Sequence, residues 1–285
     1  MKSLDIIDTH FHIWNPEIIN IPWLGMFDGK LKSSYSIHEY MQAISGFNIK
    51  KSCYVEVDAI EAQHQLESEM ILELCHDSSN QVMGATIPAN LALEGFTTYI
   101  EAFAKDKAVK SVRHNFFLAN PDILRQAIFI KNVQMLGELG IMCDLVMPAE
   151  KISYGVELAR TCPDTTFVVN HCGVCPILGD KNTKSVWRNG IEQYGLQANV
   201  ICKISECGFT NPDYQWQIAD VVEIIKHCLT TFGENRVVYG TNWPVCEMMG
   251  SIEHWLEALE VCLMDYPEHF AKKLFYDNAQ KYYDL

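Results

Sequence analysis

The sequence predicts an α/β protein built as one (β/α)8 TIM barrel over residues 1–285. Short apolar runs alternate with helix-like segments almost from end to end. No repeat, linker or break in composition divides the chain, which predicts a single domain. A doubly wound sheet is the second-ranked fold. It would need a glycine-rich phosphate turn after the first strand, where this chain has DTHFHIW.

Eight runs have the character of parallel strands buried on both faces, since they are short and mostly apolar. They are LDIID (4–8), SCYVEV (52–57), VMGATI (82–87), VKSVRH (109–114), IMCDLV (141–146), TFVVNH (166–171), VICKIS (200–205) and RVVYGT (236–241). Between the first two runs, residues 15–36 form a long loop that we expect to cap the barrel mouth. Residues 174–190 form a second loop expected to influence substrate choice.

Helical patterns fill the intervals between the strand-like runs. They cover residues 64–75, 121–139, 149–162 and 214–229. Pro121 suits the first turn of its helix because proline's missing N–H has no partner to lose there. Gly140 marks the end of the same helix, where glycine readily adopts a left-handed conformation.

The charge and cysteine content limit the partners of the chain. Thirty-six acidic against 22 basic residues give a net charge of −14, which argues against nucleic acid or an anionic membrane surface. The N-terminus lacks a secretory core, and no apolar stretch approaches the ~20 residues of a membrane span. Eleven cysteines without a disulfide-framework spacing predict a reducing, cytoplasmic location. A homo-oligomer remains open.

Polar residues follow nearly every predicted strand. The C-terminal ends of parallel barrel strands converge on one mouth, so these side chains are expected to meet there. They are Asp8, His10, His12, Glu56, Asp58, Asn90, Arg113, His114, Asp144, His171, Lys203, Ser205, Glu206, Thr241 and Asn242. The sequence therefore predicts an active site at the mouth.

His10 and His12 form the sharpest local signal. Residues i and i+2 of an extended segment point to the same side, so both imidazoles can face one metal ion or one substrate oxygen. An isolated HxH is more often a pair of loop histidines, but its position at the end of the first strand favours a site. His171 holds the equivalent place after the sixth strand, where a buried histidine bonded to a backbone carbonyl is the alternative.

Two cationic side chains are expected near the same mouth. Arg113 can hold a carboxylate or a polarised carbonyl through its planar guanidinium, and an ion pair with Glu56 or Asp144 is compatible with that role. Lys203 has the strand parity of Ser205 and would face the barrel interior. Its alternative is to extend outward between helices.

Two further motifs carry little functional weight. Cys172 and Cys175 have CxxC spacing, but no matching second pair completes a zinc site, and Pro176 and Gly179 indicate a loop where a redox motif would open a helix. No GxSxG element supports a serine hydrolase.

Taken together, several ordered motifs resemble the lactonase branch of the amidohydrolase superfamily, which includes fuconolactone, rhamnonolactone and pyrone-dicarboxylate lactonases. They are DTHFHIW, IPWL, SVRHNF, FVVNHCG, CKIS, YGTNWPVC and LFYDNAQKYYDL, in chain order from residue 8 onward. The resemblance implies a (β/α)8 barrel that opens a sugar lactone to its hydroxy acid. The expected ligand is therefore a small sugar lactone or sugar acid.

The resemblance also implies roles for individual residues. His10, His12 and His171 would line the centre of the mouth and hold either a divalent metal such as zinc or the lactone carbonyl. Some members of this branch work without a metal ion, so a metal-independent site agrees equally with the pattern. Substrate contacts are expected from Arg113, His114, Glu56, Lys203, Trp14 and Trp243.

Three positions depart from the family pattern. Asn242 stands where the family has the aspartate that activates water, Asn170 replaces another aspartate, and Glu206 replaces a glycine. An amide cannot act as a base and is a poor ligand for a zinc-like ion. We therefore expect Glu206 to supply the base, with Glu56 and His171 in reserve. The predicted catalytic residues are His171, Glu206 and Asn242.

Asn242 is also compatible with three alternatives to a working lactonase. The residue could be an engineered change that traps a substrate. The protein could be a weakened or inactive homologue that binds a sugar acid or lactone without turning it over, because fold alone does not establish activity. A metal-dependent decarboxylase or lyase of the same superfamily is the third alternative.

Overall fold

A computed structural model of the chain describes residues 4–27, 29–117, 120–208 and 215–285. Within these residues, eight parallel strands form one sheet in sequence order, β1 to β8. The strands are β1 (Ile6–Phe11), β2 (Ile49–Val55), β3 (Val82–Pro88), β4 (Val109–Asn115), β5 (Met142–Val146), β6 (Phe167–Val169), β7 (Val200–Ser205) and β8 (Val237–Gly240).

The sheet closes on itself where the chain after β8 meets β1. The backbone N–H of Asn242 donates to the carbonyl of His10 over 2.7 Å, and that of His12 donates to the carbonyl of Trp243 over 2.7 Å. Gly240 permits this approach, because a Cβ at that position would lie 2.6 Å from the Cβ of His10. The predicted TIM barrel is confirmed.

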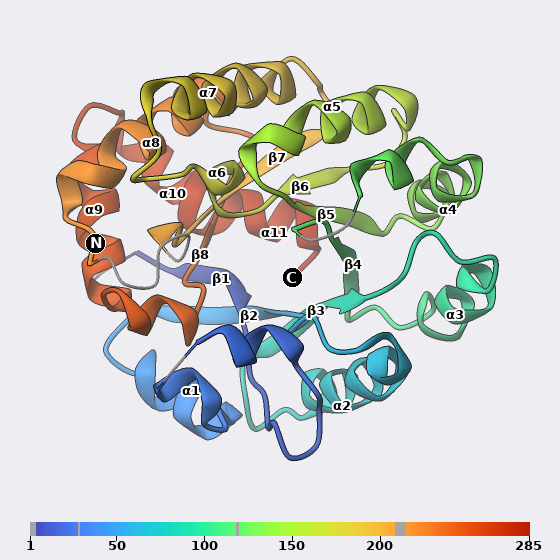
Figure 1. Cartoon of the computed structure of the whole chain (residues 1–285). Coiled ribbons are helices and arrows are strands. Elements are labelled where there is room, and N and C mark those ends of the chain that lie inside the picture. Colours follow the sequence, from blue (N-terminus) through green and yellow to red (C-terminus); the bar gives the residue numbers. More distant parts are fainter. Residues whose placement is uncertain (1–3, 28, 118–119, 209–214) are drawn as a thin grey trace.

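The described helices are α1 (Ile37–Ala43), α2 (His64–His76), α3 (Phe96–Phe103), α4 (Ala127–Glu138), α5 (Ile152–Thr161), α6 (His171–Val174), α7 (Lys181–Gly195), α8 (Ile218–Phe232), α9 (Ile252–Leu263), α10 (Glu268–Lys272) and α11 (Asn278–Tyr283). Helices α1 to α5 and α7 to α9 surround the strands in a ring, with the colour order of the sequence running once around the barrel (Figure 1). Each described helix is too short or too polar to span a membrane.

Short 3-10 and π segments complete the connections. The 3-10 helices are η1 (Pro22–Met26), η2 (Lys30–Lys32), η3 (Glu61–Gln63), η4 (Pro121–Arg125), η5 (Ala149–Lys151) and η7 (Val245–Met248), and the π segment is η8 (Lys273–Asp277). The first two lie in the predicted capping loop 15–36, of which residue 28 is outside the described residues.

All eight predicted strands are present, but the helix predictions need correction. The helix predicted over 121–139 is two helices, because Gln126 has an extended backbone (φ −68°, ψ 137°) between η4 and α4. The segment predicted over 149–162 likewise begins with η5 before α5. The helix predicted from 214 begins at Ile218 as α8, and residue 214 itself lies outside the described residues. Gly140 does end α4, with φ +70°.

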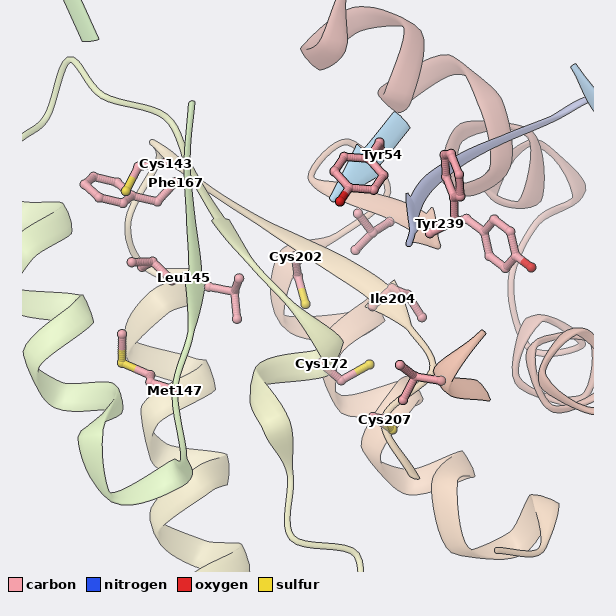
Figure 2. Packing of buried hydrophobic residues seen from close by; sticks show 14 of the residues in the cluster. Tyr54, Cys143, Leu145, Met147, Phe167, Cys172, Cys202, Ile204, Cys207 and Tyr239 are labelled. Carbon is pink, nitrogen blue, oxygen red and sulfur yellow. The ribbon is translucent and has the colours of Figure 1, made fainter. Parts of the chain in front are cut away.

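The hydrophobic core has an inner and an outer part. Inside the barrel, Ile7, Val168 and Val238 pack against Ala279 and Tyr283 of α11, which close the end opposite the active-site mouth. The outer core fills the space between strands and helices, and Figure 2 shows Cys172, Cys202 and Cys207 among its apolar side chains. All eleven cysteines are free and only Cys75 is not fully buried, so they pack as small hydrophobic residues.

Candidate active site

Two histidines of β1 and one that follows β6 meet at the mouth of the barrel. The Nε2 atoms of His10 and His12 lie 3.1 Å apart, in agreement with their i, i+2 spacing. The ring centroid of His171 lies 4.4 Å from that of His10. All three side chains are buried. The first and sixth strands therefore contribute to one cluster of imidazoles.

Hydrogen bonds to carbonyls fix the tautomers of two of these rings. Nδ1 of His12 lies 2.7 Å from the carbonyl oxygen of Val55, and Nδ1 of His171 lies 2.9 Å from that of Glu206. A carbonyl only accepts, so Nδ1 carries the proton in both rings and Nε2 carries the lone pair. Nε2–H of His10 then donates to Nε2 of His12.

Burial keeps the imidazoles neutral. It lowers the pKa of His12 to about 3, with a further contribution from the positive charge of Arg113. The pKa values of His10 and His171 are held well below 6.5 by burial first, and then by neighbouring imidazoles and by Arg113 and Lys203. At neutral pH the cluster therefore offers uncharged acceptors and donors.

An unusual turn presents His171 to the cluster. β6 ends at Val169, and His171, Cys172, Gly173 and Val174 all have positive φ, so this single turn is left-handed. Such a conformation costs roughly 1–2 kcal/mol for each residue with a side chain. Residues held in this way concentrate at functional sites, where the surrounding structure enforces them.

Arg113 makes an ion pair rather than standing alone. Its Nε donates to Oε1 of Glu56, and its Nη2 donates to the backbone carbonyl of Glu56 over 2.6 Å. Both side chains are buried. The ion pair with Glu56 agrees with one of the expectations from sequence, and it fixes the plane of the guanidinium at the mouth.

Lys203 points into the barrel and does not extend outward between helices. Its Nζ lies 3.0 Å from Oδ2 of Asp144, and both side chains are fully buried. Oδ2 also accepts from Nδ2 of Asn170 over 2.8 Å. An aspartate at position 170 would place a second carboxylate against Asp144, so the amide suits this neighbour. Nζ of Lys203 also lies 5.7 Å from the ring centroid of Tyr283, so this polar network borders the apolar interior cluster.

Glu206 and Asn242 lie together beside the histidines. The carboxylate of Glu206 is 1% exposed, and it accepts a short hydrogen bond from the backbone N–H of Gly208. Nδ2 of Asn242 lies 3.5 Å from Oε2 of Glu206 and 3.5 Å from the backbone carbonyl of the same residue. Burial raises the pKa of Glu206 to about 7. Asn242, whose backbone N–H donates to the carbonyl of His10, thus lies beside a carboxyl group that can exchange a proton near neutral pH.

Asp8 supports this arrangement, although the sequence assigned no separate role to it. Its carboxylate accepts from the hydroxyls of Thr241 (2.7 Å) and Tyr40 (2.8 Å) and from the backbone N–H groups of His10 (3.1 Å) and Thr241 (2.9 Å). It therefore ties the histidine strand to the segment that carries Asn242. The position of Asp8, two residues before the HxH motif, is the feature of the sequence from which this role could have been predicted.

Three residues predicted to contact substrate lie apart from the cluster or are otherwise engaged. His114 packs outside the barrel against Phe116 and Phe129, with ring centroids 4.8 and 5.5 Å away. The indole N–H of Trp14 donates to the carbonyl of Ser33 over 2.9 Å, although its ring lies 6.4 Å from that of His12. The indole of Trp243 donates to Glu247 over 2.8 Å.

The arrangement of the side chains at the mouth determines whether they could bind a metal ion. Among the residues that the structure describes, no three His, Cys, Asp or Glu side chains are grouped so as to hold one ion. Zinc sites usually need three or four protein ligands, whereas the Nε2 atoms of His10 and His12 bond to each other here. The side chains as arranged do not fit a metal site, and the ligand set His10, His12 and His171 stays a prediction.

Comparison with known proteins places the chain in a family. The amidohydrolase family model matches residues 7–285, so the chain belongs to the amidohydrolase family. The chain is 22% identical to the L-rhamnono-gamma-lactonase of Scheffersomyces stipitis, covering 100% of each protein. It is 24% identical to the L-fucono-1,5-lactonase of Burkholderia multivorans, covering 88% of each. The resemblance inferred from the sequence motifs is confirmed.

A solved structure agrees with the fold. The amidohydrolase of Burkholderia multivorans crystallised with bound zinc has a TM-score of 0.86 at 19% identity, covering 98% of this chain and 99% of that one. At this identity the likeness establishes the barrel and not the activity.

Proposed function

We propose that this protein hydrolyses the lactone of a sugar acid to the open hydroxy acid. Its relatives from Scheffersomyces and Burkholderia are sugar lactonases, which supports the substrate class. The observation that carries the proposal is the buried carboxyl of Glu206, which lies beside Asn242 and has a pKa of about 7. It provides a base where the family's aspartate is absent.

Glu206 would act first as a base and then as an acid. Its carboxylate takes a proton from water as the oxygen attacks the lactone carbonyl. The protonated carboxyl then returns that proton to the ring oxygen when the C–O bond breaks. A group with a pKa near the working pH suits both steps, which typically contribute ~10²–10⁴-fold. Water and lactone are consumed, and one hydroxy acid is formed.

Arg113 would stabilise the negative charge that develops on the carbonyl oxygen. Its guanidinium is held by Glu56 at the mouth, so its orientation needs no rearrangement during the reaction. His171 suits a different role from the contact to the lactone carbonyl that the resemblance implies, because its Nε2 carries a lone pair and accepts rather than donates. It is the reserve base. No step is assigned to a metal ion.

A second candidate is a sugar-acid binding protein without catalysis. Asn242 favours it, since an amide cannot remove a proton from water. Arg113 would then hold the carboxylate of the sugar acid. The two candidates share a ligand class and differ only in turnover.

The deciding experiment measures proton release with a panel of aldonolactones, with and without a chelator. It uses the wild-type protein and Asn242→Asp. Hydrolysis by the wild type supports the proposal, and loss of activity with chelator would assign a role to a metal ion. If neither form opens any lactone while both bind sugar acids, the lactonase proposal fails and the binding candidate replaces it.

A further inference from the structure

Asp58 follows β2 at the mouth and has an unusual backbone. Its φ is +56°, a left-handed conformation that aspartate adopts less readily than glycine. The side chain is half-buried, whereas its neighbour Glu56 is buried. Strained positions of this kind are enriched at functional sites, so the residue is a candidate for a role beyond turn formation.

One hydrogen bond, from an amide that is itself oriented, holds the carboxyl group of Asp58. Its Oδ2 accepts from Nδ2 of Asn115 over 3.0 Å. The amide of Asn115 is itself oriented, because its Oδ1 accepts from the backbone N–H of Phe117 over 2.9 Å. Asn115 lies two residues beyond Arg113 on β4 and therefore faces the same side of the strand. The carboxyl of Asp58 accordingly lies on the mouth side of β4.

Asp58 differs from the neighbouring Glu56 in the charge of its hydrogen-bond partner. Glu56 is bound by Arg113, and its Oε2 accepts from the backbone N–H of Asp58 over 2.5 Å. The direct side-chain partner of Asp58 is the neutral amide of Asn115. Burial and the charge of Glu56 raise the pKa of Asp58 to about 6, so it remains mostly ionised at neutral pH. An oriented, partly accessible carboxylate results.

We propose that Asp58 binds a hydroxyl group of the substrate and thereby gives the site its preference for hydroxylated lactones over unsubstituted ones. This inference rests on the proposed function and adds the residue that reads the sugar. A hydroxyl donates well to a carboxylate, and such charge-assisted hydrogen bonds are roughly twice as strong as neutral ones. Arg113, two residues before Asn115 on β4, would meet the carbonyl end of the same molecule.

The test compares two substitutions that tolerate a left-handed backbone. Asp58→Asn removes the charge and keeps the shape, and Asp58→Gly removes the side chain while relieving the strain. Asp284→Asn is the matched control, because Asp284 also has a positive φ (+46°) but is exposed near the C-terminus, far from the mouth in sequence and fold. Thermal unfolding verifies that each variant is folded.

The readout is the selectivity between rhamnono- or fuconolactone and γ-butyrolactone, which carries no hydroxyl. For Asp58→Gly we expect KM for the hydroxylated lactone to rise at least tenfold, with kcat/KM for γ-butyrolactone within twofold of wild type. Asp58→Asn should fall between. An unchanged selectivity ratio, or an equal loss on both substrates, would overturn the inference.

A separate measurement distinguishes failure of this inference from failure of the proposed function. If the wild type opens no lactone, calorimetric titration with the corresponding aldonates replaces kinetics. At least tenfold weaker binding by Asp58→Gly, with the Asp284→Asn control unchanged, supports hydroxyl recognition without turnover. Equal affinities of wild type and Asp58→Gly overturn it. A wild type that neither binds aldonates nor opens lactones removes both proposals.

Discussion

The substitution Glu206→Gln tests whether Glu206, rather than another carboxyl group of the chain, is the catalytic base. Glutamine keeps the size of the side chain and can accept from the N–H of Gly208, but it cannot take a proton from water. We expect kcat/KM for a sugar lactone to fall at least tenfold and up to ~10⁴-fold, the upper end of what acid–base catalysis typically contributes. The corresponding increase in the activation barrier is roughly 1.4 to 5 kcal/mol.

The same substitution has a calculable effect on stability. The pKa of Glu206 rises from 4.5 to about 7 on folding, so the folded state favours the protonated form. The protonated carboxyl group of Glu206 therefore makes its full contribution to the free energy of unfolding below pH 4.5, and this contribution is lost as the pH rises through 7. A shift of this size corresponds to about 3 kcal/mol, most of it between pH 5 and pH 8. Glutamine does not ionise and escapes this loss.

Two assays test these expectations together. The pH dependence of kcat/KM for the wild type should rise to a plateau above an apparent pKa of about 7. Urea unfolding at pH 5 and pH 8 should show Glu206→Gln gaining on the wild type by about 2 to 3 kcal/mol as the pH rises.

The matched control is Glu67→Gln on α2. Glu67 is also a buried glutamate, with its pKa raised to about 8 by burial, but it accepts from Tyr54 and from the N–H of Val57 instead of lying beside Asn242. Its substitution should leave the apparent pKa of kcat/KM unchanged. The role of Glu206 as base is refuted if Glu206→Gln retains wild-type activity. Its raised pKa is refuted if the stability of Glu206→Gln relative to wild type does not change between pH 5 and pH 8.

Three further predictions concern the surrounding charges. Asn242→Asp places a second carboxylate near Glu206 and should move the apparent pKa of kcat/KM at least one unit upward; a tenfold gain in rate with a midpoint near pH 4 to 5 would instead identify the aspartate as base. Lys203→Met leaves Asp144 buried without its cation and should cost about 3–5 kcal/mol in urea unfolding, largely recovered by adding Asp144→Asn; a loss under 1 kcal/mol contradicts this. His12, with a folded pKa of about 3, stays neutral when the unfolded state becomes charged. It should therefore cost about 2 kcal/mol of stability between pH 7 and pH 5, and His12→Gln should show a flatter pH dependence of unfolding than the wild type.

Much of the barrel could be predicted because its strands are short, apolar and separated by helix-like or polar segments. All eight runs are strands in the structure, since parallel strands buried on both faces have few other ways to fold. The helices were harder. Nothing in local propensity showed that Gln126 would be extended and divide η4 from α4. Helices α1, α3, α7 and α9 lie in segments for which no helix was predicted. Helices α1 and α3 are shorter than the ones detected, and α7, which occupies much of the segment predicted as a loop over 174–190, is more polar. Helix α9 is as long as α4 and mostly apolar, so its pattern was present in the sequence and was missed.

The candidate site was predictable to the extent that strand alternation controls it. The i, i+2 spacing placed His10 and His12 together, and the same alternation explains why Arg113 faces inward while His114 faces helix α4. The relation of Asn242 to Glu206 could not be predicted. It depends on a left-handed residue at 242, with φ +59°, and on contacts between segments that are distant along the chain.

The closure of the barrel has a consequence for how the protein becomes active during synthesis. The histidines of β1 are synthesised early. Asp8, on the same strand, accepts a hydrogen bond from Thr241, which lies 233 positions later, so β1 is fully anchored only after Thr241 has been made. Asn242 adds its own bond to His10 at the same seam. A ribosome-bound chain that has not yet exposed β8 would therefore carry the histidines without a formed catalytic centre. Activity should appear in one step, late in translation, and serve as a reporter of complete folding.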